Sequence, residues 1–552
     1  MFTLLIWHGY LLGGTGSNIY SANIAAAWVQ AGHRVVLMCQ DPAPERFDWV
    51  HEIHDVTGAQ ISRVREVTPG GADARTRSGA GACIVVRADI GGVLPVYVLD
   101  RYAGWEVRRV TDMSDAELEA WSDGYRTALT GILEREAPDG ILLNHLVPVP
   151  ALIRGVCDEY GVPYAIKVHG SELEYAMAEQ PDRWRSSARF ALDGAHAVLV
   201  GSAHIARRTQ ELVDTDIPRA IEIPPGVDLS LFAPTDDRAS TARALVRELA
   251  QREARSDGRS RDDANVLNRV MAEHEDAAAR ATAIASLHGS WQERDVDLGV
   301  ADAITAADLA DDGVPTIVFV GKFIRQKGVH LLLAALPIVR QVVPDLRCVI
   351  VGFGPQREGL ESLLSLLDAG DIDGFLALAR HGALLDDGPD ESFPQIVAMA
   401  ERWDPAERDA YEACAVGLRS AVTFTGLVDH AVLAQLWPLC TASVVPSILP
   451  EAFGMVSAEA AACGCIPIVS HHSGLATVAD ALDAAHADTA TSMHSFDVHA
   501  SDAVIQLAQR ITEVCAMDAT ERAHRASSCR EVVERLWSWD SIADRIARCI
   551  TS

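Results

Sequence analysis

The chain has 552 residues and a formal net charge of −30; 49% of its residues are hydrophobic and 22% are charged. This length predicts two or more domains, because single hydrophobic cores stop growing at about 250–300 residues. The negative charge disfavours a nucleic-acid partner and a broad basic membrane-docking face. No apolar run is long enough to span a membrane, and residues 1–7 carry no basic leader, so we expect a cytoplasmic protein without an integral membrane segment.

Two residue types are used in an unusual way. Lysine occurs only at Lys167, Lys322 and Lys327, whereas nearly every other cation is arginine. These lysines either mark an anion site or are leftovers of residue usage. The 11 cysteines are odd in number and scattered, with no CxxC pair, which favours free thiols in a reducing compartment.

Short apolar runs alternate with helical patterns along most of the chain. The predicted strands are residues 3–7, 34–38, 140–143, 163–168, 197–200, 316–320, 347–351, 422–424, 442–445 and 466–469. Helices are predicted at residues 18–31 and 329–343, among others, and an amphipathic helix at 534–550. This alternation predicts an α/β fold of two doubly wound, Rossmann-like domains built on parallel sheets.

Two acidic stretches interrupt this rhythm. Residues 234–312 hold 10 basic and 17 acidic residues with a helical period, and residues 367–420 hold 4 and 12. Half of the net charge therefore belongs to insertions. The predicted domains are residues 1–225, a connection with an insertion at 226–311, residues 312–530 with the second insertion at 367–420, and a C-terminal helix at 531–552.

Glycine-rich and basic turns follow the first strand of each domain. Residues 13–18, Gly-Gly-Thr-Gly-Ser-Asn, join a strand to a helix, where backbone amides can approach an anion. The equivalent turn of the second domain, residues 321–328, contains Lys322, Arg325 and Lys327, whose charges suit phosphate oxygens. A solvated basic turn is the alternative.

Two further segments carry polar groups at strand ends or helix starts. Glu451 precedes a predicted helix that begins near Met455, and Glu459 lies in its early turns, where a carboxylate can accept from two vicinal hydroxyls. Lys167 and His169 alternate in a strand, so they share a face near the carboxyl edge of the first sheet, where ligands of such sheets bind. Asn144, which ends another strand beside a histidine, is a weaker candidate of the same kind.

Taken together and in this order, these segments resemble the family-four retaining glycosyltransferases of the GT-B fold. The matching positions are Gly13 and Gly14, residues 169–172, residues 223–228 with Phe232, residues 321–328, 352–355 and 424–426, and Glu451 through Glu459. Three departures stand out. Lys322 replaces the usual Arg, Phe353 replaces an acidic residue, and Ser473 occupies the first glycine of a Gly-Gly-x-x-Glu pattern that ends at Thr477 rather than at Glu.

The resemblance implies a sugar nucleotide bound mainly to the second domain, with the first domain on the acceptor side across a cleft. Lys322 and Lys327 would then hold the diphosphate of the donor. Glu459 would accept from the ribose hydroxyls, and Glu451 would contact the transferred sugar.

It also implies backbone contacts. Amides of three successive residues would serve sugar and phosphate: Phe453, Gly454 and Met455. The Gly13–Gly14 turn would close over the diphosphate, His169 would lie near the reacting sugar, and backbone around Gly354 and Gly426 would border the base.

The implied reaction moves a hexosyl group from a nucleoside diphosphate sugar, most commonly a UDP-sugar, to the hydroxyl of a small-molecule or glycan acceptor. No cofactor is expected, and no metal, since lysines can neutralise the diphosphate; Asp295 and Asp297 are interpreted as solvated surface. A sugar-nucleotide epimerase, a phosphorylase or a non-catalytic nucleotide-sugar binding protein are the alternatives. Oligomeric state, the acceptor, and the roles of Lys167 and the insertions are not predicted.

Overall fold

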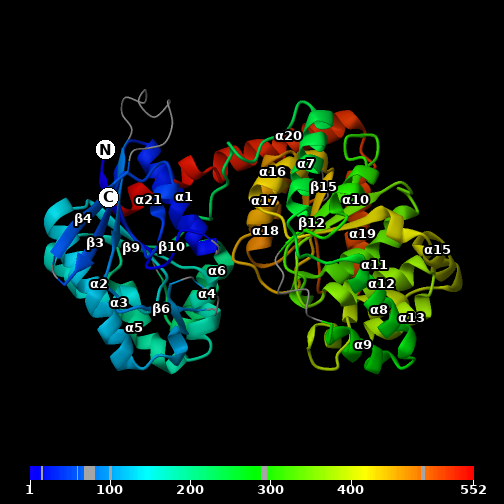
Figure 1. The fold of residues 1–552 in the computed structure, drawn as a ribbon, viewed down its shortest axis with the longest axis horizontal. Coiled ribbons are helices and arrows are strands. Elements are labelled where there is room, and N and C mark those ends of the chain that lie inside the picture. The colour runs from blue at the N-terminus through cyan, green and yellow to red at the C-terminus, as the bar shows by residue number, and fades with distance from the viewer. Residues whose placement is uncertain are drawn as a thin grey trace. The chain divides into compact units, whose positions relative to one another are not determined.

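The computed structural model describes residues 1–13, 16–58, 60–67, 81–97, 102, 104–217, 219–287, 295–485 and 492–551. The chain divides into two compact units, Met1–Gly226 with Leu536–Ser552, and Val227–Arg535 (Figure 1). Each unit has helices packed around its own sheet, which confirms the predicted α/β class.

The first unit is built on a nine-stranded sheet of order β11-β10-β9-β8-β1-β2-β5-β3-β4. All neighbouring strands in it run parallel except the pair β3 and β4. Its strands are β1 (Thr3–Trp7), β2 (Arg34–Met38), β3 (Glu52–Thr57), β4 (Gln60–Glu66), β5 (Ala82–Arg87), β8 (Gly140–Asn144), β9 (Tyr164–Lys167), β10 (Ala197–Val200) and β11 (Ala220–Glu222), with a separate ribbon of β6 (Val93–Val96) and β7 (Glu106–Arg109). Near-continuous apolar runs form the central strands, because helices cover both faces of a parallel sheet.

Among the described residues, six α-helices of more than one turn surround this sheet. They are α1 (Gly16–Gln30), α2 (Asp115–Glu136), α3 (Val149–Tyr160), α5 (Pro181–Gly194), α6 (Ala203–Val213) and, from the far end of the chain, α21 (Trp539–Thr551). The prediction of one helix at 534–550 is wrong in one respect: the helix is interrupted between α20 (Ala519–Leu536) and α21. At the break, Oγ of Ser538 accepts from the backbone N–H of Ser541 (3.3 Å), which starts the new helix.

The second unit holds a six-stranded parallel sheet of order β14-β13-β12-β15-β16-β17. Its strands are β12 (Thr316–Val320), β13 (Arg347–Val351), β14 (Val422–Gly426), β15 (Ala442–Val445), β16 (Ile466–Ser470) and β17 (Ser495–Phe496). The helices that follow its strands are α11 (Val329–Arg340), α12 (Arg357–Asp368), α16 (His430–Leu436), α17 (Met455–Ala462), α18 (Ser473–Ala484) and α19 (Ala503–Cys515). All ten strands predicted from the sequence lie within one or two residues of strands of the two sheets.

The two acidic stretches are mainly helical. The first contains α7 (Arg238–Glu253), α8 (Arg261–Glu273), α9 (Ala277–Ala285) and α10 (Val300–Ala306), and the second contains α13 (Ile372–Ala379), α14 (Pro394–Glu401) and α15 (Pro405–Ala415). In the first stretch, Val296 also forms an isolated bridge to Gly426 at the edge strand β14. The insertions therefore pack onto the second sheet's own elements.

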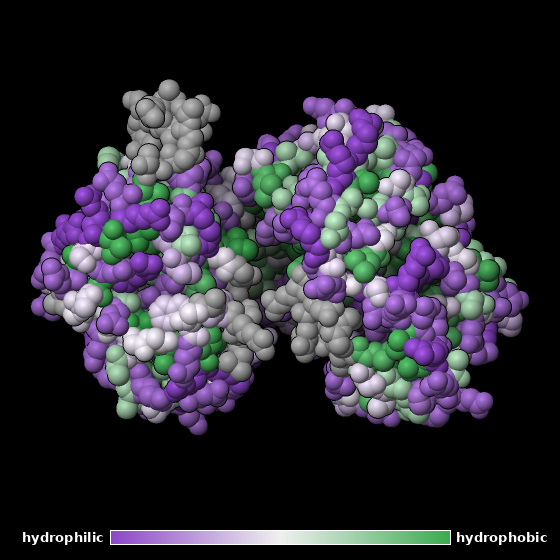
Figure 2. All heavy atoms as spheres, viewed as in Figure 1, coloured by the Kyte–Doolittle hydropathy of each residue, from purple (hydrophilic) through white to green (hydrophobic). Residues whose placement is uncertain are grey.

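The surface is largely hydrophilic, and most of the cysteines lie in the interior. Hydrophilic residues cover much of the face in Figure 2, and hydrophobic residues lie scattered among them. All 11 cysteines are free, and nine of them are buried. In the described part of the chain, no helix combines the length and apolar character that crossing a membrane requires.

Candidate functional site

The basic turn of the second unit lies between β12 and α11, at the carboxyl end of the central strand. Gly328 has φ +70°, and a Cβ there would overlap the Pro446 carbonyl, so the turn packs tightly against the loop after β15. The backbone N–H of Ile448 in that loop donates to the carbonyl of Gln326 (2.7 Å). Lys322 is exposed and Lys327 is half-buried. The fold thus fixes the backbone of the turn and leaves cationic side chains accessible.

Lys327 of this turn forms an ion pair with Glu451, which is 124 positions away in sequence. Lys327 Nζ donates to Glu451 Oε1 (2.9 Å), and Ser447 Oγ donates to the same oxygen. The side chains of Lys327 and Glu451 stay 31% and 22% exposed, so a ligand can reach both. The Glu451 backbone N–H donates to Ser473 Oγ (2.9 Å), which fixes the loop from behind.

The start of α17 lies beside this pair. Gly454 has φ +149°, which favours glycine, and a Cβ on it would come within 2.9 Å of Leu475 Cδ2. Met455 begins the helix, so the amides of Gly454 and Met455 belong to a helix N-terminus, which favours anions. Phe453 is buried, and Gly474 packs against its backbone.

Glu459 lies one turn into α17 and is almost fully buried. Burial raises its pKa to about 8. His430 lies beside it, with Nε2 3.8 Å from Glu459 Oε1, and burial lowers the pKa of that imidazole. The carboxyl therefore changes protonation state near neutral pH, when most carboxyls are already ionised.

Gly354 and Gly426 are both in close contact with protein backbone. Gly354 has φ +151°, and a Cβ there would lie 2.7 Å from the Phe323 nitrogen. At Gly426 (φ +72°), a Cβ would lie 2.7 Å from the nitrogen of Asp297, in the first insertion. The insertion also supplies the carbonyl of Asp295, which accepts from the Leu427 N–H (2.9 Å).

The interpretation of Asp297 as solvated surface is wrong. Its side chain is only 13% exposed and pairs with Arg357 (2.6 Å). The pairing arises because the insertion folds back onto the edge of the second sheet, a contact that local sequence does not reveal.

In the first unit, the turn after β1 is held by polar side chains. Asn18 Nδ2 donates to the Gly13 carbonyl (2.7 Å), and the Leu12 N–H donates to Asp41 Oδ2 (2.9 Å). His8 Nε2 donates to Asn18 Oδ1 (2.9 Å), and burial lowers the pKa of His8 to about 3. Gly14, predicted beside Gly13, lies outside the described residues.

His169 sits at the carboxyl edge of the first sheet, just after β9. Its Nε2 donates to Asn144 Oδ1 (2.9 Å), and its backbone N–H donates to Glu172 Oε1 (2.7 Å). Glu172 is fully buried and also accepts from His145 Nδ1 (3.1 Å). Burial, reinforced by His145 and Lys167, holds the pKa of His169 well below its usual value, so the imidazole is neutral.

Lys167 is buried, and its ammonium and the His169 ring both lie against the Tyr20 ring. Its Nζ donates to the Ile223 carbonyl (2.6 Å) and lies 5.2 Å from the centre of the Tyr20 ring. Burial lowers the pKa of Lys167 to about 7. This lysine supports the segment where the chain leaves the first unit.

Four residues that position the predicted groups were only weak candidates or were not predicted as site residues: Asn144, Glu172, Ser447 and Ser473. Asn144 carried only the signal of ending a strand. Glu172 follows His169 at the spacing of a capping box, a pattern that could have indicated its role. Ser447 carries no sequence signal, and Ser473 was visible only as a departure from glycine.

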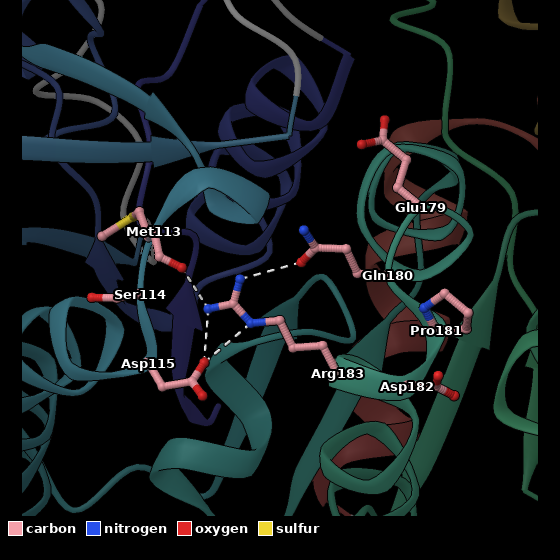
Figure 3. Close-up of a pocket in the computed structure, with 8 residues that line it drawn as sticks. All are labelled: Met113, Ser114, Asp115, Glu179, Gln180, Pro181, Asp182 and Arg183. Carbon is pink, nitrogen blue, oxygen red and sulfur yellow. Dashed lines mark hydrogen bonds and ion pairs between the residues drawn. The ribbon is translucent and has the colours of Figure 1, made fainter.

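The first unit also has an open hollow of about 670 Å³ at the start of α2 and α5 (Figure 3). It is lined by Met113, Ser114, Asp115, Glu179, Gln180, Pro181, Asp182 and Arg183. Arg183 donates to the Met113 carbonyl (2.6 Å) and to Asp115 Oδ1 (2.8 Å), which ties the two sides together. No predicted site residue lines this hollow.

Two family models match the chain. The model described as "Glycosyl transferase 4-like domain" matches residues 15–226, and the one described as "Glycosyl transferases group 1" matches residues 301–372 and 405–512. The gaps between these ranges, residues 227–300 and 373–404, fall on the two acidic, mainly helical stretches.

Solved structures share the fold at low sequence identity. The catalytic domain of starch synthase IV from Arabidopsis thaliana, bound to ADP and acarbose, is 12% identical with a TM-score of 0.52, covering 100% of this chain and 98% of that one. The Anabaena protein HepE, in complex with UDP and glucose, is 13% identical with a TM-score of 0.50, covering 99% of each chain. A glycosyltransferase from Rickettsia africae is 11% identical with a TM-score of 0.50, covering 99% and 97%. No curated protein sequence matches.

Proposed function

Since the chain belongs to the family-four glycosyltransferases of the GT-B fold, we propose that it moves a hexosyl group from a nucleoside diphosphate sugar to an acceptor hydroxyl, with retention of anomeric configuration. A UDP-sugar, the most common donor in this family, is the proposed donor. The acceptor is a small molecule or a glycan.

One observation carries the proposal: the ion pair of Lys327 with Glu451 at the carboxyl end of β12. A partly exposed pair of this kind contributes little to stability, typically below about 1 kcal/mol. It does keep a cation and a hydrogen-bond acceptor together where a sugar diphosphate needs both. On donor binding, Lys327 turns to the diphosphate and Glu451 accepts from hydroxyls of the transferred sugar.

Cleavage of the anomeric bond leaves negative charge on the diphosphate. Lys327 and the exposed Lys322 stabilise that charge, together with the first amides of α17. The two lysines supply the positive charge that a divalent ion supplies elsewhere, so the proposed reaction is metal-independent. Full activity in a chelator supports this part of the proposal, and loss of activity that a divalent ion restores contradicts it.

Glu459 is the proposed acceptor for the ribose hydroxyls. Because its pKa is about 8, the Glu459 carboxyl is largely protonated at neutral pH and is ionised above pH 8. The ionised form accepts from both vicinal hydroxyls, so donor affinity is expected to rise with pH through this range.

His169 is the proposed contact to the reacting sugar from the first unit. It is neutral, and its Nε2 hydrogen bond with Asn144 leaves Nδ1 as an acceptor for a sugar hydroxyl. A neutral imidazole does not repel the positive character that develops on the sugar. The departing diphosphate is the proposed base for the acceptor hydroxyl, by analogy with the family.

The experiment is incubation of the purified chain with a panel of UDP-, GDP- and ADP-sugars, with and without an acceptor panel. Release of the nucleoside diphosphate together with a glycosylated product of retained anomeric configuration, seen by NMR, supports the proposal. Conversion of the donor without acceptor indicates an epimerase, and tight donor binding without turnover indicates a binding protein; either result contradicts it.

A further inference from the structure

The second unit has another hollow, which contains no residue of the proposed donor site. It lies along the outer edge of β14, between α8 and α12, and has a volume of about 250 Å³. Four of its lining residues are arginines: Arg259, Arg261, Arg357 and Arg419. We call it the arginine pocket.

Three carboxylates, Asp297, Glu358 and Glu361, pair with three of the four arginines. Arg259 makes a two-pronged ion pair with Glu358 (2.8 and 2.9 Å). Glu361 accepts from Arg357 (2.9 Å) and from Arg419, and these cations lower its pKa to about 2, so it stays ionised.

The carboxylate oxygens are used more fully than the guanidinium groups. Arg357 is 6% exposed, and its Nε is buried with no hydrogen-bond partner in the described part of the chain. Arg419 reaches Glu361 through one terminal nitrogen, and its side chain is 45% exposed. Arg261, exposed at the start of α8, has no ion pair to any described residue. Guanidinium N–H groups without an acceptor in the described part of the chain therefore lie around the hollow, and its lining holds four arginines against two carboxylates, Asp297 and Glu361.

We propose that the arginine pocket binds a compact phosphate-bearing anion. Guanidinium forks match phosphate oxygens and stay charged at every physiological pH. The first insertion supplies Arg259 and Arg261, so the site gives that insertion a role as one wall of an anion site.

A row of contacting side chains connects the arginine pocket to the basic turn at residues 321–328. The Arg357 guanidinium lies 4.2 Å from the centre of the Phe424 ring, and Phe424 packs edge-on against Phe323, 5.9 Å between centres. Phe323 is the neighbour of Lys322 in the basic turn. An anion that draws on Arg357 therefore acts on a side chain two contacts from the proposed diphosphate site.

The test is isothermal titration calorimetry with inorganic phosphate at constant ionic strength. All variants carry Lys322→Ala and Lys327→Ala, which remove both lysines of the proposed diphosphate site. We expect Arg261→Ala with Arg419→Ala to weaken phosphate binding at least tenfold, and Arg419→Lys, which keeps the charge without the fork, to weaken it less. Arg269→Ala, an exposed arginine on the same helix α8 that does not line the pocket, is the matched control and should change nothing.

Phosphate binding that is absent from the parent protein, or equally strong after both substitutions, overturns the proposal. Thermal unfolding checks that the double variant folds. If it does not, Arg261→Ala alone decides, since that side chain holds no ion pair and its loss should still weaken binding severalfold. The experiment measures phosphate binding and not sugar transfer, so its outcome does not depend on whether the proposed function is correct.

Discussion

The two sites differ in how their polar groups are satisfied. Around His169 in the first unit, polar side chains are buried and hydrogen-bonded to one another. The lowered pKa values of His8 and His169 keep both imidazoles neutral. Around Lys327 in the second unit, charges are accessible, and the main ion pair is formed by groups that a ligand can separate. Under the proposed function, we expect the second unit to supply charge to an anionic donor and the first unit to supply neutral polar groups.

The largest effect is expected from removing the accessible charge. Lys327→Ala should lower kcat by about 10²–10³-fold, because one preorganised group that stabilises the leaving diphosphate is lost. The unfolding temperature should hardly change, since the exposed pair adds little stability. Steady-state kinetics and calorimetry measure the two effects, with Lys327→Arg as the charge-retaining control. Turnover within a few-fold of the parent contradicts the assignment.

The first unit should respond in the opposite way. Glu172→Ala leaves the His169 N–H and the His145 ring without their buried acceptor, which should cost about 2–4 kcal/mol of unfolding free energy. Chemical denaturation measures this loss. Glu172→Gln, which keeps one acceptor oxygen, should lose less. An equal loss in the two variants would show that the hydrogen bonds are not what stabilises the cluster.

Glu459 is a titratable group of the second unit that is buried like the histidines of the first. Its folded pKa of about 8 lies above the ordinary value of 4.5, so the folded state holds more protons between these values. Unfolding free energy should therefore fall as pH rises from about 4.5 to 8, by about 2 kcal/mol or more, while donor affinity rises. Glu459→Gln should remove both trends. Stability curves of the two proteins that run parallel from pH 5 to 9 would exclude a raised pKa.

The smallest effect is expected at Ser473, which supports Glu451 from behind. Ser473 has φ +53°, a conformation that favours glycine, yet its Oγ accepts from the Glu451 N–H. Ser473→Gly relieves the backbone strain and loses the hydrogen bond, so stability should change by less than about 1 kcal/mol. Ser473→Ala keeps the strain and should lose about 1 kcal/mol. Thermal denaturation ranks the two, and the reverse order would contradict the strain argument.

Sequence predicted the parallel sheets well because their strands are continuous apolar runs, such as residues 316–320. It missed β3, β4, β5, β11 and β17. Of these, β4 (Gln60–Glu66) is almost all polar or exposed at a sheet edge, whereas β5 (Ala82–Arg87) is a buried apolar run that was not predicted. The proximity of Lys327 and Glu451 was predictable, because each follows a strand of the same parallel sheet and the carboxyl ends of parallel strands lie at one edge of the sheet. Asp297 was not, because its partner Arg357 is 60 positions away and nothing local distinguishes a paired aspartate from a solvated one.

The helix α21 comes from the far end of the chain and completes the first unit (Figure 1). Trp28 Nε1 donates to the Ala543 carbonyl (2.8 Å), and Ile542, Ile546 and Ile550 join the core that contains Ile6 and Trp28. Gly140 lies so close to the Ile550 carbonyl that a Cβ would overlap it.

This arrangement has a consequence for biosynthesis. Residues 1–226 leave the ribosome first, yet about 300 more residues must follow before α21 can dock, roughly 15–60 s at ordinary elongation rates. During that interval the apolar face that α1 and β8 present to α21 stays uncovered, while the second unit, whose residues all precede α21, can already fold. The domain translated first is therefore the last to reach its native core, and the nascent chain offers a chaperone a defined hydrophobic surface to protect.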